Sequence, residues 1–346
     1  MIPRVLRELN LLKPLLQIRA MSKSGQHYPK IINSACNNAT LTLNHTCLRV
    51  KDPKVSVAFY KKHFGMNLLE KKDFPDMKFS LLFLSFPNKV VPTNSQGGNA
   101  VFAMNGVLEL THNWGTENDA DFKVNNGNEE PHRGFGHICF SVPNIEETCK
   151  RLESEGAAFK KRLVDGRQKD IAFVFDPDGY WIELIQYLKE EEPVPDNKEN
   201  KKFNHTMMRV KDAEKSLAFY QNVLGMKLIK SSVHENAKFT LYFLGYGINK
   251  GENSRSTEGL LELTHNWGTE SDPAFKYHNG NDKPQGYGHI CISCKDPATM
   301  CHEIEQKYGD EIEWGVKFNG GKMKNLAFIQ DPDGYSIEIV PADLTL

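Results

Sequence analysis

The chain has 346 residues, of which 39 % are hydrophobic and 25 % charged, with a formal net charge of −1 and seven cysteines. This length accommodates two ordinary domains with sizeable cores, and the composition is typical of a soluble globular protein. The balanced charge gives no reason to expect a nucleic-acid or anionic-membrane partner, and no apolar run approaches the roughly 20 residues of a membrane span. An odd number of cysteines spread along a long chain favours reduced thiols, so we expect a cytoplasmic protein.

Residues 1–40 stand apart as an N-terminal extension. Residues 1–20 carry three arginines, one lysine and one acid, with leucines at helical spacing. This pattern partly resembles a mitochondrial presequence, and we treat the segment as a candidate targeting segment. The alternative is an upstream extension before a second start at Met21. A mitochondrial location therefore stays open beside the cytoplasmic one.

The remainder of the chain is a long tandem repeat. The string "LELTHNWGTE" occurs at 108–117 and again at 261–270, and three further strings recur in the same order: "LNHTCLRVKD" at 43–52 and "FNHTMMRVKD" at 203–212, "GFGHICFSV" at 134–142 and "GYGHICISC" at 286–294, "DPDGYWIELI" at 176–185 and "DPDGYSIEIV" at 331–340. Such a long period means duplicated domains. Because a duplicated fold needs only its apolar pattern repeated, the repetition of polar residues indicates a duplicated site.

The repeats have clear boundaries. We place repeat 1 at 41–188 and repeat 2 at 203–346. Between them, "KEEEPVPDNKENKK" at 189–202 is rich in charge and contains two prolines, which predicts a solvated, charged linker.

Each repeat contains one short module twice. In repeat 1 an alternating strand at 41–50 precedes a helix at 53–64, which has Pro53 at its start and Gly65 as its stop. The elements expected after it are strands at 67–72, 79–86 and 107–111, a strand from Gly136, a helix at 145–155, and strands near 159, at 171–175 and at 180–187. The string "DPDG" before the last strand is a tight-turn signal. The predicted fold class is α+β, with four βαβββ modules in two tandem homologous repeats.

Polar residues of the repeated strings share the faces of strands that point away from the core, because side chains alternate along a strand. His45 shares a face with Cys47 and Arg49, and Glu109 lies opposite Leu108 and Leu110. By the same alternation each repeat aims two histidines and two glutamates from four strands toward a non-core face: His45, Glu109, His137 and Glu183 in repeat 1, and His205, Glu262, His289 and Glu338 in repeat 2.

These eight residues predict two metal sites. A lone glutamate in a strand most often faces solvent, and a lone histidine is usually structural, but complete sets in both repeats favour a ligand role. Two imidazoles and two carboxylates suit a borderline divalent metal such as zinc, nickel or iron. His112 and His265 fall on the opposite, leucine-bearing face of their strands, and we interpret them as structural.

The strings "NHTCLRVKD", "LELTHNWGTE", "RGFGHI" and "DPDGYWIEL" resemble those of the lactoylglutathione lyase (glyoxalase I) family of the vicinal-oxygen-chelate superfamily, in its fused two-repeat form. The resemblance implies modules paired into eight-stranded half-barrels. It implies conversion of the hemithioacetal of methylglyoxal and glutathione to S-lactoylglutathione, through an enediolate. It also implies two Zn²⁺ per chain, with nickel or another divalent metal as the alternative, glutathione as co-substrate, and a monomer with two active sites between the repeats.

The resemblance also assigns roles to residues. Glu183 and Glu338 would carry the proton, and Glu109 and Glu262 would be the other carboxylate ligands. Each site would take ligands from both repeats: His45, Glu109, His289 and Glu338 in one, and His205, Glu262, His137 and Glu183 in the other. The positions that hold glutathione in the family map to Arg49, Asn113, Arg133, Lys161, Arg209, Asn266, Lys322 and Met323. In repeat 2 the counterparts of Arg133 and Lys161 are uncharged, as Gln285 and Val316.

The sequence departs from the family at one metal-ligand position, and two alternative functions remain. Many zinc-type members have glutamine at the first ligand position, where both repeats here have histidine. The identity of the metal therefore stays open. A ring-cleaving dioxygenase on the same fold would suit two histidines and one carboxylate with iron, but the second glutamate and the glutathione-contact pattern argue against it. A non-enzymatic binding protein on this fold has no reason to keep two complete ligand sets.

Overall fold

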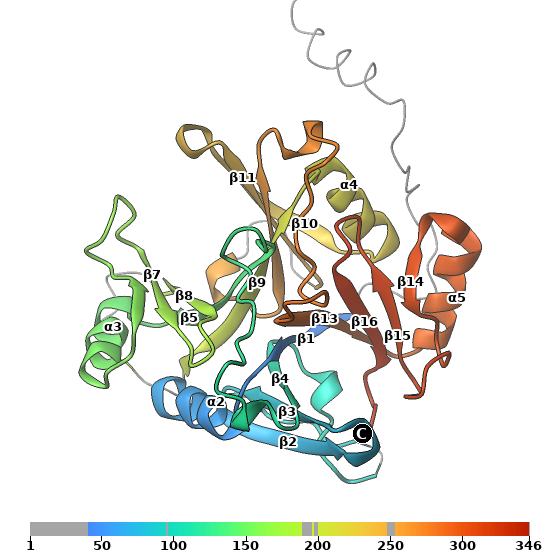
Figure 1. The fold of residues 1–346 in the computed structure, drawn as a ribbon, viewed down its shortest axis with the longest axis horizontal. Coiled ribbons are helices and arrows are strands. Elements are labelled where there is room, and N and C mark those ends of the chain that lie inside the picture. Colours follow the sequence, from blue (N-terminus) through green and yellow to red (C-terminus); the bar gives the residue numbers. More distant parts are fainter. Residues whose placement is uncertain (1–40, 95, 189–195, 197–199, 248–252, 346) are drawn as a thin grey trace, which may run out of the picture.

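The computed structural model describes residues 41–94, 96–188, 196, 200–247 and 253–345. The N-terminal extension and its candidate targeting segment lie outside these residues, so the location of the protein stays a prediction. The described part of the chain forms two eight-stranded sheets with four α-helices beside them (Figure 1). None of the helices in these ranges is long and apolar enough to cross a membrane.

The elements follow the order expected for four βαβββ modules. Repeat 1 supplies β1 (Thr42–Arg49), α2 (Pro53–Phe59), β2 (Asn67–Phe74), β3 (Phe79–Ser85), β4 (Val107–Asn113), β5 (Phe135–Val142), α3 (Ile145–Ser154), β6 (Phe159–Lys161), β7 (Ile171–Phe175) and β8 (Trp181–Gln186). Repeat 2 supplies β9 (Lys202–Val210), α4 (Ala213–Ala218), β10 (Lys227–His234), β11 (Phe239–Gly245), β12 (Leu260–Asn266), β13 (Tyr287–Cys294), α5 (Pro297–Tyr308), β14 (Glu313–Val316), β15 (Ala327–Gln330) and β16 (Ser336–Pro341).

The helix predicted at 53–64 starts and stops where expected, but only its first half is α-helical. The Asp52 carboxylate accepts a hydrogen bond from the amide of Lys54, with Pro53 in the first turn, a favourable helix start. After Phe59 the chain winds into a wider π-helical turn, Tyr60–Phe64, which ends at Gly65 with a positive φ of 75°. The wider turn brings the Tyr60 hydroxyl to Asp176, to which it donates at 3.0 Å. An apolar spacing that fits an α-helix cannot reveal this tertiary contact.

Each sheet combines one module from each repeat. The strand order is β14-β15-β16-β13-β1-β4-β3-β2 in one sheet and β10-β11-β12-β9-β5-β8-β7-β6 in the other. At the centre, β1 pairs antiparallel with β13, and β9 pairs antiparallel with β5. In Figure 1 the blue strands of the first module therefore lie beside the red strands of the last. The two repeats form their sheets only together, as the resemblance implies for the paired half-barrels.

One apolar core joins the two sheets. It includes Phe64, Phe140, Tyr180 and Tyr287, all less than 2 % exposed. The rings of Phe135 and Tyr287, from different sheets, stack with centroids 5.1 Å apart. Burial of one large apolar side chain stabilises a fold by roughly 1.5–3 kcal/mol. This shared core fixes the sheets relative to each other and leaves their polar faces for the sites.

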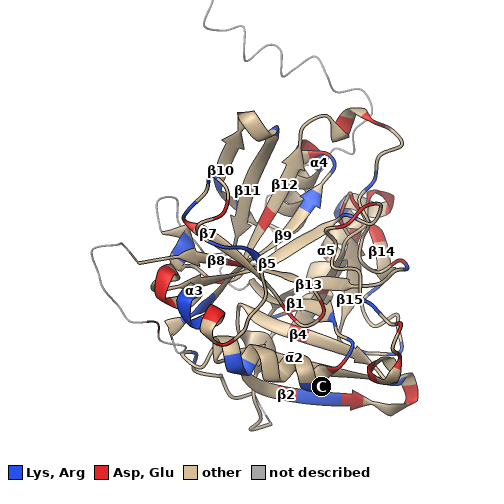
Figure 2. Cartoon of the chain, turned by 60° about the vertical axis from the view of Figure 1, so that its left-hand side comes forward, with Lys and Arg blue, Asp and Glu red and all other residues tan. Residues whose placement is uncertain are grey.

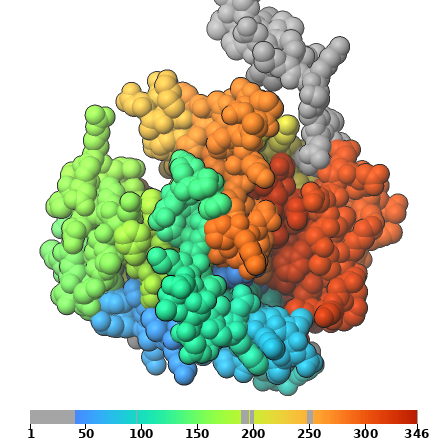
Figure 3. Space-filling model, viewed as in Figure 1, coloured from blue at the N-terminus to red at the C-terminus, as the bar shows by residue number. Residues whose placement is uncertain are grey.

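The long loops that follow the repeated tryptophans, 115–134 and 268–286, lie against one another. Figure 3 shows these segments, green and orange, side by side across the middle of the molecule. The amide of Asn125 donates to Gln285 at 2.9 Å, and the amide of His278 donates to Arg133 at 2.7 Å. Contacts between the repeats therefore extend from the sheets into the loops.

Of the predicted linker, 189–202, the structure describes Asp196 and residues 200–202, and the side chains of Asp196 and Lys201 are buried rather than solvated as predicted. The Lys201 ammonium is fully buried and lies 2.8 Å from the Asp196 carboxylate, which also binds Arg151 on α3. Each buried charge has a partner, which makes its burial tolerable.

Elsewhere, cationic and anionic residues are intermixed, as on α3 and β2 in Figure 2, in keeping with the net charge of −1.

Candidate metal centres

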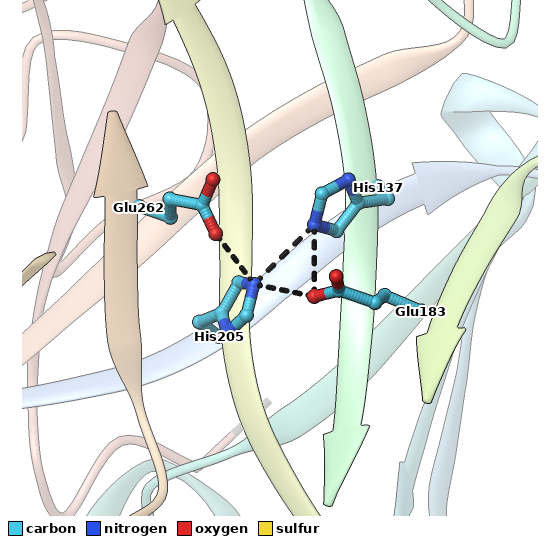
Figure 4. A group of neighbouring side chains, drawn as sticks. All are labelled: His137, Glu183, His205 and Glu262. Carbon is cyan, nitrogen blue, oxygen red and sulfur yellow. Dashed lines mark hydrogen bonds and ion pairs between the residues drawn. The ribbon is translucent and has the colours of Figure 1, made fainter. Parts of the chain in front are cut away.

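Four side chains from four strands converge on one point in the sheet that contains β5 and β9 (Figure 4). We call this group the second cluster: His137, Glu183, His205 and Glu262. The His205 Nε2 atom lies 2.9 Å from a Glu262 oxygen, 3.3 Å from a Glu183 oxygen and 3.3 Å from Nε2 of His137. The Nε2 atom of His137 lies 3.4 Å from Glu183. One ligand atom from each residue fits within 4.8 Å of all the others.

The other sheet carries the matching group, which we call the first cluster: His45, Glu109, His289 and Glu338. The His45 Nε2 atom lies 3.0 Å from Glu109, 3.5 Å from Glu338 and 3.1 Å from Nε2 of His289. The His289 Nε2 atom lies 3.5 Å from Glu338 and 3.8 Å from Glu109. In both clusters two residues come from repeat 1 and two from repeat 2, in the combinations that the resemblance implies for the ligands.

The donor atoms fit a divalent ion. Ligands about 2.1 Å from a tetrahedral zinc ion lie about 3.4 Å from one another, and the observed separations of 2.9–3.8 Å bracket this value. The side chains of the eight residues are at most 14 % exposed. Charged groups brought together at this depth need a compensating partner, and a cation would supply one for the carboxylates.

An asparagine orients the first histidine of each cluster. The Nδ1 atom of His45 lies 2.7 Å from Oδ1 of Asn44, and Nδ1 of His205 lies 2.7 Å from Oδ1 of Asn204. Because the amide oxygen can only accept, Nδ1 must carry the proton, which leaves the Nε2 lone pair for a metal. We did not predict these asparagines, although "NH" in both repeats was a signal that could have identified them.

The histidines lower the pKa of one carboxyl group in each cluster. Burial by itself would raise the pKa of Glu109, but the imidazoles of His45 and His289 lower that pKa to about 2. Burial likewise opposes ionisation of Glu183, yet His137 and His205 lower its pKa well below the usual range. Both carboxylates are therefore ionised at neutral pH, as ligands must be.

On the strand that carries the first histidine, the residue two positions after that histidine differs between the clusters. Cys47 lies opposite His289 in the first cluster, and its Sγ belongs to a compact group with Glu109 and His289. The counterpart in the second cluster is Met207, opposite His137. Burial raises the pKa of the Cys47 thiol. The sequence placed Cys47 on the same strand face as His45, but we did not count it among the candidate ligands, because only one repeat has a cysteine there.

A cavity of about 490 Å³ opens onto the second cluster. All four cluster residues line it, together with three residues assigned by resemblance to glutathione: Arg133, Arg209 and Asn266. The Arg209 guanidinium is fixed by the carbonyl of Phe135 at 3.1 Å and by Oδ1 of Asn128 at 2.9 Å. A ligand with carboxylates could therefore bind two arginines in this cavity: Arg209, which is held in place by its hydrogen bonds, and Arg133, which is half-exposed.

The other residues assigned to glutathione lie in varied settings. Arg49 is held like Arg209, by the Tyr287 carbonyl at 3.1 Å and Oδ1 of Asn281 at 2.8 Å, and Asn113 ends strand β4. Lys161 donates to the carbonyls of Gln168 and Ile171, both at 2.7 Å, so it orders the loop before β7. Lys322 is exposed, and Met323 packs on the apolar cluster beside the first cluster.

The two further repeated histidines lie outside the clusters. His112 and His265 each place Nε2 at 2.8 Å from the glutamate five residues onward, Glu117 and Glu270. These bonds close the turn after the strand, in keeping with the structural role that we assigned to both histidines.

Comparisons with known proteins agree with this geometry. The family described as "Glyoxalase/Bleomycin resistance protein/Dioxygenase superfamily" matches residues 42–184 and again 202–339. The "Glyoxalase I" of Saccharomyces cerevisiae is 64 % identical, covering 94 % of this chain and 99 % of its own length. The "Lactoylglutathione lyase" of Schizosaccharomyces pombe is 47 % identical, covering 89 % and 98 %. The crystal structure of glyoxalase I from Zea mays aligns with a TM-score of 0.66 at 28 % identity, covering 88 % and 93 %.

The chain therefore belongs to the Glyoxalase/Bleomycin resistance protein/Dioxygenase superfamily and, within it, to the lactoylglutathione lyase (glyoxalase I) group that carries both repeats on one chain.

Proposed function

We propose that both clusters convert the hemithioacetal of a 2-oxoaldehyde and glutathione to a 2-hydroxyacyl thioester, which is S-lactoylglutathione when the aldehyde is methylglyoxal. The observation that carries this proposal is the duplicated set of two imidazoles and two carboxylates, of which the second opens into an arginine-lined cavity. The reaction moves a proton between neighbouring carbons and needs no nicotinamide or flavin.

In this proposal each cluster holds one divalent ion, with zinc as the first choice and nickel or another metal as the alternative. The two imidazole and two carboxylate donors of each cluster would be its ligands. When bound, the ion supplies a Lewis acid that stabilises negative charge on the substrate oxygens.

The protein's own contribution to the chemistry is a proton acceptor. Glu183 and Glu338 are assigned this role, in which a carboxylate oxygen takes the proton from one carbon and returns it to the next. Their side chains are 11 % and 10 % exposed, whereas those of Glu262 and Glu109 are 6 % and 4 % exposed. The more accessible carboxylate of each pair is the better placed to reach a substrate carbon.

Glutathione would bind through its carboxylates. Arg133 and Arg209 line the cavity of the second cluster, and charge-assisted hydrogen bonds to carboxylates are among the stronger polar contacts. Because both clusters are complete within one chain, we propose that the monomer is active.

The experiment that tests the function compares Glu183→Gln, Glu338→Gln and the double variant. Thioester formation from methylglyoxal and glutathione is followed by absorbance. Each single variant should keep the activity of its intact cluster, and the double variant should fall by roughly 10²–10⁴-fold, the usual effect of removing general-base catalysis. Full activity in the double variant would contradict the assignment.

Metal removal provides the matched control. Chelation should abolish turnover in the unmodified protein, add-back of zinc or nickel should restore it, and metal analysis should give about two ions per chain. Activity that persists without oxygen would exclude the ring-cleaving dioxygenase alternative, since that reaction consumes oxygen.

A further inference from the structure

Matching turns border the two clusters on the side away from Arg49 and Arg209. They are Val101–Ala103 in repeat 1 and Ser254–Ser256 in repeat 2. Asn44 donates to the carbonyl of Val101 at 2.9 Å, and Asn204 donates to the carbonyl of Ser254 at 2.7 Å. The same asparagines orient the cluster histidines, so each turn is tied directly to a metal ligand.

These turns lie on the opposite side of the cluster histidines from Arg49 and Arg209, two of the residues assigned to glutathione. On β9, Arg209 lies four residues beyond His205, whereas Asn204 precedes it. A strand rises about 3.3 Å per residue, so the arginine and the turn extend in opposite directions from the cluster. A hemithioacetal whose glutathione part binds Arg209 would direct the side chain of its aldehyde toward the turn.

The wall that this aldehyde side chain would meet differs between the sites. We call it the distal wall: Val101, Phe102, Leu326 and Val340 beside the first cluster, and Ser254, Arg255, Ile171 and Ile185 at the matching positions beside the second. The first set belongs to a buried apolar cluster, and the second set lines the 490 Å³ cavity.

The first distal wall leaves little room. Val101 and Val340 are 0 % exposed, and Phe102 is 3 % exposed. The Phe102 ring packs on Phe83 at 5.4 Å and on the His45 ring at 5.9 Å between centroids. Leu344, near the C-terminus, completes this cluster. Water does not reach the two valines, so a bulky group could enter only if these side chains moved.

The second distal wall is more open than the first, and two of its four residues, Ser254 and Arg255, are polar. Arg255 lines the cavity with its side chain 43 % exposed, and it donates to Asp170 at 2.8 Å. Phe243, the counterpart of the fully buried Phe83, is partly exposed in the same cavity. A larger or more polar group can be accommodated here without displacing packed side chains.

We infer that the distal walls give the two sites different substrate ranges. The first cluster accepts 2-oxoaldehydes with a small apolar side chain such as methyl, and the second also accepts larger or polar side chains. This inference rests on the proposed function and deepens it.

The test uses the variants in which one site works alone. Glu183→Gln leaves the first cluster active, and Glu338→Gln leaves the second. In each we would measure kcat/KM for the hemithioacetals of methylglyoxal and phenylglyoxal. The phenylglyoxal-to-methylglyoxal ratio should be at least about tenfold higher for the second cluster, because inserting a large group into packed side chains is costly.

Substitutions in the two turns test whether the distal walls cause the difference in substrate range. Phe102→Ala in the Glu183→Gln variant should raise the ratio, and Arg255→Phe in the Glu338→Gln variant should lower it. Val90→Ala in the Glu183→Gln variant is the control, because Val90 belongs to the same connection between β3 and β4 but is 90 % exposed; it should leave the ratio unchanged.

The outcomes separate this inference from the proposed function. Equal ratios at the two sites, with both turning over methylglyoxal, would overturn the distal-wall inference alone. Absence of methylglyoxal turnover in both single variants would overturn the proposed function and the inference with it. If Phe102→Ala does not fold, the inference is still tested by the ratios of the Glu183→Gln and Glu338→Gln variants and by Arg255→Phe.

Discussion

At the scale of single residues, Asn44 and Asn204, which precede His45 and His205, each have two structural roles. Asn204 orients His205 through Oδ1, while its Nδ2 atom donates to the carbonyls of Ser254 and Thr257 at 2.7 and 2.6 Å. Asn44 does the same for His45 and for the turn Val101–Ala103. One amide therefore fixes both the tautomer of a ligand and the position of the distal wall.

This geometry predicts a loss of metal affinity when the asparagine is removed. Asn204→Ala, made in a His45→Ala background so that only the second cluster is intact, should weaken zinc binding by roughly 10–100-fold, the usual effect of losing a hydrogen bond that orients a ligand. Competition against a chromogenic chelator measures the affinity. Asn44→Ala in the same background is the control and should leave it unchanged; equal effects of both variants would contradict the assignment.

At the scale of elements, the two "DPDG" turns connect the modules within each repeat. Oδ1 of Asp176 accepts from the amides of Asp178 and Tyr180, both at 2.9 Å, and Oδ2 accepts from the Tyr60 hydroxyl. Asp331 binds Tyr220 in the same way in repeat 2. Burial and the neighbouring Asp178 raise the pKa of Asp176 to about 7. Burial also raises that of Asp331.

The raised pKa of Asp176 predicts a pH dependence of stability. The unfolded chain loses this proton near pH 4, whereas the folded protein holds it to about pH 7. The stabilising contribution of the protonated carboxyl is therefore complete below pH 4 and is lost as the pH rises to about 7. One such proton contributes a slope of at most about 1.4 kcal/mol per pH unit to the free energy of unfolding.

Asp176→Asn should flatten this slope, because the amide does not titrate. Urea unfolding at pH 5, 6, 7 and 8 would measure it, with the exposed Asp76→Asn variant as control. Slopes in Asp176→Asn that match those of the unmodified protein would show that Asp176 is ionised throughout this range.

The elements and ligands could be predicted from the sequence to different degrees. The predicted strand at 171–175 and the start of the helix at Ile145 agree with the structure, because alternation and capping are local signals. The π-helical turn after Phe59 was not predicted, since its apolar spacing also fits an α-helix and its contact from Tyr60 to Asp176 joins residues far apart in the sequence. The cluster residues were recognisable because each is duplicated, whereas Cys47 has Met207 as its counterpart. The distal walls depend on packing and had no local signal.

At the scale of the whole molecule, neither repeat can assemble a cluster alone. His45 and Glu109 lie on β1 and β4, whereas His289 and Glu338 lie on β13 and β16 of the same sheet. The hydroxyls of Thr46 and Thr206, each next to a cluster histidine, hydrogen-bond to each other where the repeats meet. The two clusters therefore approach each other where the repeats meet, although they share no residue.

This arrangement predicts how paired substitutions combine. His45→Ala with Glu338→Gln damages only the first cluster, so the pair should keep about the activity of its worse single parent, because residues of one catalytic unit are not additive. His45→Ala with Glu183→Gln damages both clusters and should lose nearly all activity. The measurement is kcat with methylglyoxal and glutathione, together with metal content. If the first pair were inactive and the second retained activity, each repeat would have to build its own site, and the pairing of β1 with β13 would not describe the working enzyme.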